Sequence, residues 1–113
     1  MNEVSFEDFA KLDIRIGTVV AAERVPDTDK LLKCTVDFGG MPEGIGIRTI
    51  VSGVAEWKAP EDIIGKQFPY IVNLAPRIIR GVESQGMLLA VRDEAGVALL
   101  APERAVVNGA HVQ

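Results

Sequence analysis

The sequence has few of the residues on which catalytic and metal sites are usually built. Its 113 residues include one cysteine, Cys34, and one histidine, His111. A single cysteine excludes an internal disulfide and fits a reducing compartment. One histidine close to the end of the chain leaves little material for a histidine-based triad or a metal cluster. We therefore expect a protein that is not an enzyme and that uses no metal or other cofactor.

Long apolar runs and targeting signals are also missing. No apolar stretch approaches the roughly 20 residues that span a bilayer, and the start at Met1 shows no charged segment followed by an apolar one. The apolar fraction of 48% is typical of a folded soluble domain rather than of a disordered chain. We expect a single cytoplasmic domain, residues 1–113, with its own core and with no membrane partner.

The chain has no excess of positive charge. Its formal net charge is −4, so the molecule as a whole does not attract a polyanion. Basic residues are concentrated in the middle, however: residues 30–92 carry eight against six acids, whereas residues 1–29 carry three against seven. A nucleic-acid site must then be a local patch on an acidic body. Such a patch favours specific docking, because the distant acidic surface repels the phosphate backbone.

Turn signals divide the chain into short strands. Every second residue from 32 to 38 is apolar, which predicts a half-buried strand with Cys34 as an inert thiol in the core. Gly17, inside a predicted strand at 14–25, indicates a bulge or a tight bend. The same signals predict the remaining elements: a capped helix at 5–11, strands at 48–55, 67–74, 86–91 and 97–100, and a helix from Pro60 to Gly65.

Five main strands with a short helix between the third and the fourth is the order of an OB-fold. The expected fold is therefore all-β: a five-stranded Greek-key barrel over residues 12–94 with short helices, an N-terminal extension and a C-terminal extension over residues 95–113. Other small barrels share this pattern of strands.

Six segments together resemble the tRNA-binding domain family. They are "KLDIRIGTVV" (11–20), "DKLLK" (29–33), "RTIVSGVA" (48–55), "PEDIIGK" (60–66), "NLAPRIIRGVESQGMLLA" (73–90) and "LLAPERAVVNGAHV" (99–112). The likeness runs in the family's order over nearly the whole chain. The family includes free-standing dimeric tRNA-binding proteins, the C-terminal appendage of methionyl-tRNA synthetases, and the chaperone-like protein CsaA.

The resemblance implies an OB-fold dimer that recognises tRNA by shape and backbone, without catalysis and with little sequence preference. Because the chain starts at Met1 and ends just past the domain, it is similar to the free-standing form. It fits equally well a detached subunit that works beside an aminoacyl-tRNA synthetase, the methionyl type first. Few aromatic residues flank the expected site, which argues against a single-strand binder and for docking to folded RNA.

Arg77 and Arg80 are the central candidates for RNA contact. They lie three residues apart between the fourth and fifth predicted strands, where an OB-fold flanks its ligand groove. Guanidinium groups can fork onto phosphate oxygens, and Gly81 permits close approach of the backbone. Taken alone, the two arginines fit equally well as solvated loop charges paired with Glu83.

The resemblance adds further candidates to this site. Lys33 is expected outside the barrel beside the groove, with Arg48 near the same face and Ser52 on the same side as Arg48. Without the resemblance, the basic residues would be interpreted as solvated charges at strand edges, Asn73 as a turn amide and Met87 as a core residue. The full set implied for tRNA binding is Lys30, Lys33, Arg48, Ser52, Asn73, Arg77, Arg80, Ser84 and Met87.

Two other functions remain open. The first is a CsaA-like chaperone that binds unfolded or export-bound proteins, which an exposed apolar groove lined by Met87, Ile78 and Ile79 would favour. The second is a purely architectural module that dimerises and tethers a synthetase.

Apolar residues outside the five barrel strands predict a homodimer interface. The alternative is that the C-terminal extension covers one end of the barrel within a monomer. The interface candidates are Phe6 and Phe9 in the N-terminal helix and Leu99, Leu100, Val106 and Val107 near the C-terminus.

Overall fold

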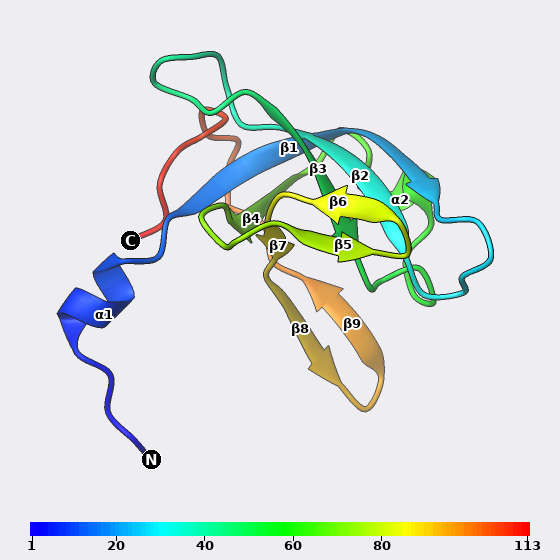
Figure 1. The fold of residues 1–113 in the computed structure, drawn as a ribbon, viewed down its shortest axis with the longest axis horizontal. Helices are drawn as coiled ribbons and strands as arrows, with labels where there is room; N and C mark the ends of the chain where they lie inside the picture. Colours follow the sequence, from blue (N-terminus) through cyan, green and yellow to red (C-terminus); the bar gives the residue numbers. More distant parts are fainter.

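The computed structural model of the chain describes residues 1–113 and shows an almost entirely β fold (Figure 1). Its elements, in order, are α1 (Phe6–Ala10), β1 (Ile14–Arg24), β2 (Leu32–Asp37), β3 (Ile47–Ser52), α2 (Pro60–Ile63), β4 (Gln67–Ile71), β5 (Arg77–Ile79), β6 (Val82–Ser84), β7 (Met87–Leu88), β8 (Ala90–Asp93) and β9 (Gly96–Leu99). The main sheet has the order β3-β2-β1-β4-β7, and all of its pairs are antiparallel. The predicted all-β, OB-like barrel is confirmed.

Side chains that alternate along the strands fill the barrel. The period-two prediction for residues 32–38 is confirmed, since every second residue there is buried. The Phe38 and Tyr70 rings meet edge to face at the centre, with centroids 5.4 Å apart. Such an edge-to-face pair adds to the stability that simple burial of the two rings provides.

The bulge predicted at Gly17 is wrong. Gly17 pairs regularly with Phe68 of β4, and the irregularity in β1 falls three residues later, where the register with β2 shifts between Val19 and Ala21. Gly17 is instead required by packing. A Cβ at this position would lie 2.6 Å from a methyl group of Val36 and 2.7 Å from the Phe38 ring.

Hydrogen bonds that join β3 to Ser84, the last residue of β6, and to Gln85 complete the barrel. The Gln85 N–H donates to the Thr49 carbonyl (2.8 Å), and the Gln85 side-chain oxygen accepts from the Thr49 N–H (3.0 Å). The next N–H of β3 with this orientation, that of Val51, donates to the Ser84 hydroxyl (3.0 Å). Because these bonds satisfy an edge that β7 is too short to pair, the barrel is nearly closed.

Two short hairpins extend from the barrel (Figure 1). The β5–β6 hairpin lies over the barrel beside β3, and the β8–β9 hairpin projects from the end of β7. The strand predicted at 86–91 is therefore divided into β7, which pairs with β4, and β8, which pairs with β9. Since residues 96–99 pair with 90–93, a boundary at 94 would cut through a hairpin.

The C-terminal segment runs back along the first half of β1. The Ile16 N–H donates to the Ala110 carbonyl (2.9 Å), and the Val112 N–H donates to the Ile14 carbonyl (2.8 Å). The side chain of Asn108 accepts hydrogen bonds from Thr18 (2.6 Å) and Gln67 (3.0 Å). The segment thus covers one side of the barrel within the monomer. No helix in the fold is long and apolar enough to cross a membrane.

Candidate functional site

A groove opens between the β1–β2 loop (residues 25–31) and the tip of the β5–β6 hairpin. A hollow of about 380 Å³ lies there, lined by Arg80 from the hairpin and by residues 27–31 from the loop. These are the two loops with which an OB-fold flanks its ligand. The structure thus brings together two of the predicted contacts, Lys30 and Arg80, which are 50 positions apart in the sequence.

The conformation of the hairpin turn holds Arg80 at its tip. Ile79 pairs with Val82, so Arg80 and Gly81 form a two-residue turn. Their φ angles are +51° and +79°, the pattern of a type I′ turn. An asparagine is favoured at the first of these positions and a glycine at the second, so an arginine there is unusual. The predicted loop is in fact a two-stranded hairpin.

Arg77 and Arg80 are free of acidic partners. No carboxylate lies within 4.0 Å of either guanidinium. Arg77 pairs across the hairpin with Ser84, whereas Glu83 pairs with Ile78 and so lies on the opposite face from Arg77. The alternative interpretation, in which Glu83 neutralises the arginines, is therefore wrong.

The two lysines carry only weak ion pairs. Lys30 Nζ is 4.0 Å from a Glu56 carboxylate oxygen, and Lys33 Nζ is 3.7 Å from a Glu23 oxygen. These side chains are all well exposed, and exposed pairs of this kind contribute at most about 1 kcal/mol. Both lysines can exchange these partners for a phosphate. The position of Lys33 on the outer face of β2 is as predicted, because Leu32 and Cys34 on either side of it are buried.

Arg48 does not lie on the same face as Lys33. It pairs with Val36, a core residue, and therefore points toward the inside of the sheet. Its Nη1 donates to the carbonyls of Val72 and, at 3.3 Å, Gln85. Val72 and Gln85 lie just before and just after the segment that contains the β5–β6 hairpin. Arg48 thus clamps the base of the hairpin, with a hollow of about 360 Å³ beside it.

Ser52 and Ser84 are buried and cannot reach a ligand on the surface. Ser52 pairs with Leu32 and shares its inward face. Ser84 is 2% exposed, and its hydroxyl accepts from the Val51 N–H while donating to the Gly86 carbonyl (3.1 Å). The sequence predicted that both hydroxyls lie near the groove, whereas the pairing of the strands directs both side chains toward the interior of the protein. The Ser84 hydroxyl thereby joins the end of β6 to β3.

Asn73 uses its amide within the chain. Its Nδ2 donates to the Lys11 carbonyl (2.7 Å), and its Oδ1 accepts from the Asp13 N–H (2.8 Å). The side chain thus ties the end of β4 to the segment that enters β1. The Asn73 amide is therefore not free to bind a base or a phosphate.

The apolar candidates do not form one groove. Met87 is partly exposed on β7. Ile78 is 69% exposed, but it neighbours Ile79 in the strand β5, so the two side chains point to opposite faces of the hairpin. None of the five main hollows of the structure is lined by these three residues.

Gln85 is a structural part of the candidate site that the sequence did not predict. It closes the barrel and anchors the hairpin through both its backbone and its side chain. A glutamine between two glycine-containing turns has no local signal that separates it from an ordinary solvated residue. Its role becomes clear only from its hydrogen bonds to Thr49 in β3, which is 36 positions earlier in the sequence.

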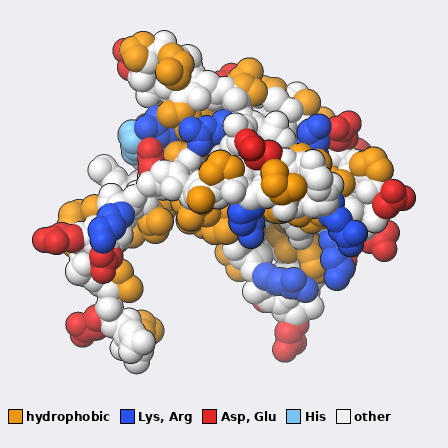
Figure 2. Space-filling model, viewed as in Figure 1, with side chains coloured by type: hydrophobic (Ala, Val, Ile, Leu, Met, Phe, Trp, Pro, Cys, Tyr) orange, Lys and Arg blue, Asp and Glu red, His pale blue; other side chains and the backbone are white.

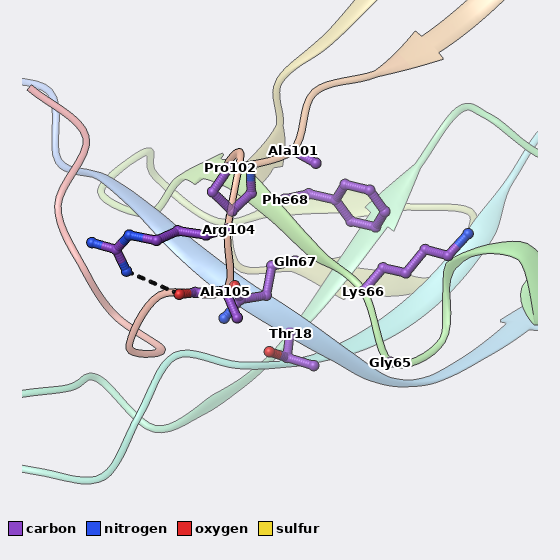
Figure 3. Close-up of a pocket in the computed structure, with 9 residues that line it drawn as sticks. All are labelled: Thr18, Gly65, Lys66, Gln67, Phe68, Ala101, Pro102, Arg104 and Ala105. Atoms are coloured by element: carbon purple, nitrogen blue, oxygen red, sulfur yellow. Dashed lines mark hydrogen bonds between the residues drawn. The ribbon is translucent and has the colours of Figure 1, made fainter.

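Two further hollows lie along the C-terminal segment. Figure 3 shows the larger one, of about 420 Å³, with the Lys66 and Arg104 side chains at its rim and the Gln67 amide turned toward Ala105. That amide is already hydrogen-bonded to Val106 and Asn108. The second hollow, of about 310 Å³, is mostly apolar and is lined by Ile16, Pro69, Leu100, Ala101, Pro102, Val106, Ala110, His111 and Val112.

The chemically reactive groups lie away from the groove. Burial raises the pKa of the Cys34 thiol from 9.0 to about 11, so it is protonated at neutral pH. His111 pairs with Arg15 beside β1, and its Nδ1 is 3.4 Å from an Asp13 oxygen. No three histidine, cysteine, aspartate or glutamate side chains lie together in a way that could hold a metal ion.

The comparisons with known proteins agree with this geometry. The family described as "Putative tRNA binding domain" matches residues 14–111. The methionine–tRNA ligase of Porphyromonas gingivalis is 46% identical over 112 residues, which are 98% of this chain and 16% of that protein. The chain thus spans about a sixth of the length of that curated relative.

Solved structures give the same result over complete chains. A MetRS-related protein from Pyrococcus horikoshii is 40% identical, with a TM-score of 0.91 and full coverage of both chains. The chaperone CsaA from Bacillus anthracis is 33% identical, with a TM-score of 0.86 over 99% of this chain and 100% of that one.

Proposed function

Because the chain belongs to the tRNA-binding domain family, we propose that it binds folded tRNA in the cytoplasm, without catalysis, through the groove between residues 25–31 and the β5–β6 hairpin. One observation carries the proposal. Arg80 lies in a conformation that disfavours side chains, at the tip of a rigid turn, across the groove from Lys30 and without an acidic partner. A strained residue that the surroundings hold in place supports a functional role.

The proposed contacts are Lys30, Lys33, Arg77 and Arg80, with Met87 as an apolar neighbour. Four phosphate contacts predict that the logarithm of the association constant falls with the logarithm of salt concentration with a slope of about −3. The remaining candidates, Arg48, Ser52, Asn73 and Ser84, support these contacts from within the fold. Since the body of the protein is acidic, the cations of the groove restrict RNA to this face.

Arg80→Asn separates binding from folding. The substitution creates an Asn-Gly pair, the preferred sequence for a type I′ turn, and it removes one cation. We expect the melting temperature to stay the same or to rise. The affinity for labelled bulk tRNA should fall about tenfold, the scale of one charge-assisted contact, and the salt slope should become about one unit less steep.

Arg104→Ala is the matched control, because it removes one exposed arginine far along the chain from the groove. Its effect on tRNA affinity should be small. Anisotropy titrations at two salt concentrations measure all three proteins. Wild-type protein that fails to bind tRNA even at low salt would refute the proposed function, and equal losses in the two variants would move the site away from Arg80.

We further propose that the protein acts as a homodimer. The α1 helix buries none of its residues, and Phe6 is 80% exposed, with its ring centroid 6.4 Å from that of Phe9. Each chain also carries the apolar hollow lined by Leu100 and Val106. A two-fold axis would place the helix of each copy on the hollow of the other. Among the predicted interface residues, Leu99 packs against the core instead, and Val107 remains fully available.

A partnership with a methionyl-tRNA synthetase is the role we propose for this dimer. The P. gingivalis ligase carries a similar segment over 16% of its length. A weak tRNA-binding module gains from such a partner, because tethering raises the effective concentration of the RNA. Addition of the protein should then lower the KM for tRNA in methionylation and leave kcat unchanged.

Chaperone activity is the second candidate, and one observation favours it. The hollow beside the C-terminal segment presents an apolar surface to an apolar segment of another protein, and the fold is shared with the chaperone CsaA of B. anthracis. Protection of an unfolded model protein from aggregation, lost in Leu100→Glu and kept in Arg80→Asn, would support it. No protection by the wild type would refute it.

A further inference from the structure

Outside the groove, one arginine is held by an aromatic ring instead of an acid. The Arg92 guanidinium carbon lies 4.9 Å from the centroid of the Trp57 ring, within the range of a cation–π interaction. No carboxylate lies within 4.0 Å of Arg92, although Asp93 and Glu94 follow it in the chain. A guanidinium that stacks through its face keeps the N–H groups at its edge free for a phosphate.

The β8–β9 hairpin fixes this arginine against the barrel. Arg92 pairs with Val97 and shares a hairpin face with it, and Val97 packs against the core. The face that carries Arg92 is therefore the one turned toward the barrel. Gly96 allows the close approach, because a Cβ there would lie 2.5 Å from atoms of the Trp57 ring.

The Arg92–Trp57 pair is continuous with the groove. Glu56, the residue before Trp57, lies 4.0 Å from Lys30 Nζ, and the Ala55 N–H donates to the Lys30 carbonyl (3.0 Å). Arg24 joins the same turn, since its Nη1 donates to the Ala55 carbonyl (3.1 Å). Figure 2 shows basic side chains gathered around a hollow between the regions of the β5–β6 and β8–β9 hairpins.

We propose that the RNA-binding surface extends from the Lys30–Arg80 groove onto the β8–β9 hairpin, where Arg92, stacked on Trp57, binds a backbone phosphate of the same RNA. The inference rests on the proposed function. It gives Trp57 the role of a support that orients Arg92 toward a phosphate. The hairpin thereby becomes a third element of the site beside the β1–β2 loop and the β5–β6 hairpin.

Trp57 makes this contact directly observable. It is the only tryptophan of the chain, so its emission reports on this surface alone. Titration of the wild-type protein with unlabelled tRNA should change Trp57 emission with the same midpoint as the anisotropy of labelled tRNA. In Arg92→Ala the affinity should fall three- to tenfold, and the salt slope should become about one unit less steep. Arg92→Lys should keep the slope and recover only part of the affinity, because an ammonium group lacks the fork.

Arg104→Ala is again the control for the loss of one positive charge. The inference is overturned if labelled tRNA binds Arg92→Ala and Arg104→Ala equally well, or if wild-type Trp57 emission does not change at saturating tRNA; in either case the proposed function stands on the Arg80 result. A wild type that binds no labelled tRNA removes the proposed function and this inference together. Since Arg92 is exposed, equal melting temperatures of the variants will show that the fold is intact.

Discussion

At the scale of single residues, hydrogen bonds within the chain decide which polar groups are available to a ligand. The hydroxyl of Ser84 and the amide of Asn73 match the chemistry of an RNA contact, yet both are occupied by backbone partners. A buried N–H that loses its acceptor destabilises a fold by about 1–3 kcal/mol. Substitutions at these two positions will therefore affect stability before they affect recognition.

Cys34 gives a prediction at this scale. Because its pKa is raised to about 11, the folded protein should react with a thiol reagent at pH 8 at least about 100-fold more slowly than the unfolded protein. The measurement is the labelling rate with and without denaturant. Rapid labelling of the native protein would contradict the buried position.

The same shift sets a pH limit on stability. The folded pKa of Cys34 lies above its unfolded value of 9.0, so the folded state keeps the proton longer. The stabilisation is complete below pH 9 and is lost as the pH rises toward 11. Burial first, and then the charge of Cys34, also raises the pKa of Tyr70. This second raised pKa likewise makes the free energy of unfolding fall at high pH. Melting temperatures from pH 8 to 11 should fall less steeply in Cys34→Ala.

At the scale of elements, the β5–β6 hairpin carries two of the candidate contacts, Arg77 and Arg80. Its turn is set by Arg80 and Gly81, and its base is held by Arg48 and Gln85. A short two-stranded hairpin is marginal by itself in water. The clamp at the base therefore decides whether the arginines at the tip keep their positions.

Arg48→Ala tests this clamp. We expect faster hydrogen exchange of the β5–β6 amides and a loss of tRNA affinity of about tenfold, the scale of a hydrogen bond to a charged group. The salt slope should stay close to that of the wild type, because Arg48 makes no phosphate contact. A slope that drops by a full unit, with unchanged exchange, would instead make Arg48 a direct contact.

At the scale of the whole molecule, the chain leaves apolar surface for which it has no internal partner. The C-terminal segment covers one side of β1, as the monomer interpretation expected, but α1 extends away from the barrel (Figure 1). A helix of five residues that buries none of its side chains is too short to be stable by itself in water. A second copy that covers Phe6 and Phe9 would provide the missing packing.

Phe6→Glu combined with Phe9→Glu tests the dimer. Light scattering should give twice the chain mass for the wild type and the chain mass for the variant. The melting temperature of the barrel should change little at low protein concentration, since α1 buries nothing within the monomer. A wild-type mass equal to one chain, at concentrations up to about 100 µM, would refute the dimer.

Local patterns in the sequence determined most of the barrel. Alternation placed the side chains of β2, Ser5 and Pro60 marked the starts of the two short helices, and the six family segments indicated the fold. These features depend on a residue and its near neighbours, which is why one sequence suffices to predict them. The prediction of a bulge at Gly17 was wrong because the glycine is required by its packing against Phe38, a contact that the neighbouring residues in the sequence do not reveal.

The tertiary structure decided which candidate side chains face the groove and which point into the fold. The inward direction of Arg48 depends on its pairing with β2, and the burial of Ser84 and the contact of Arg92 with Trp57 depend on segments far apart in the sequence. A change of register by one residue turns every side chain of a strand to the other face, and nothing local records that choice. The sequence by itself thus determined the family and the barrel, whereas strand register and barrel closure determined which residues line the candidate site.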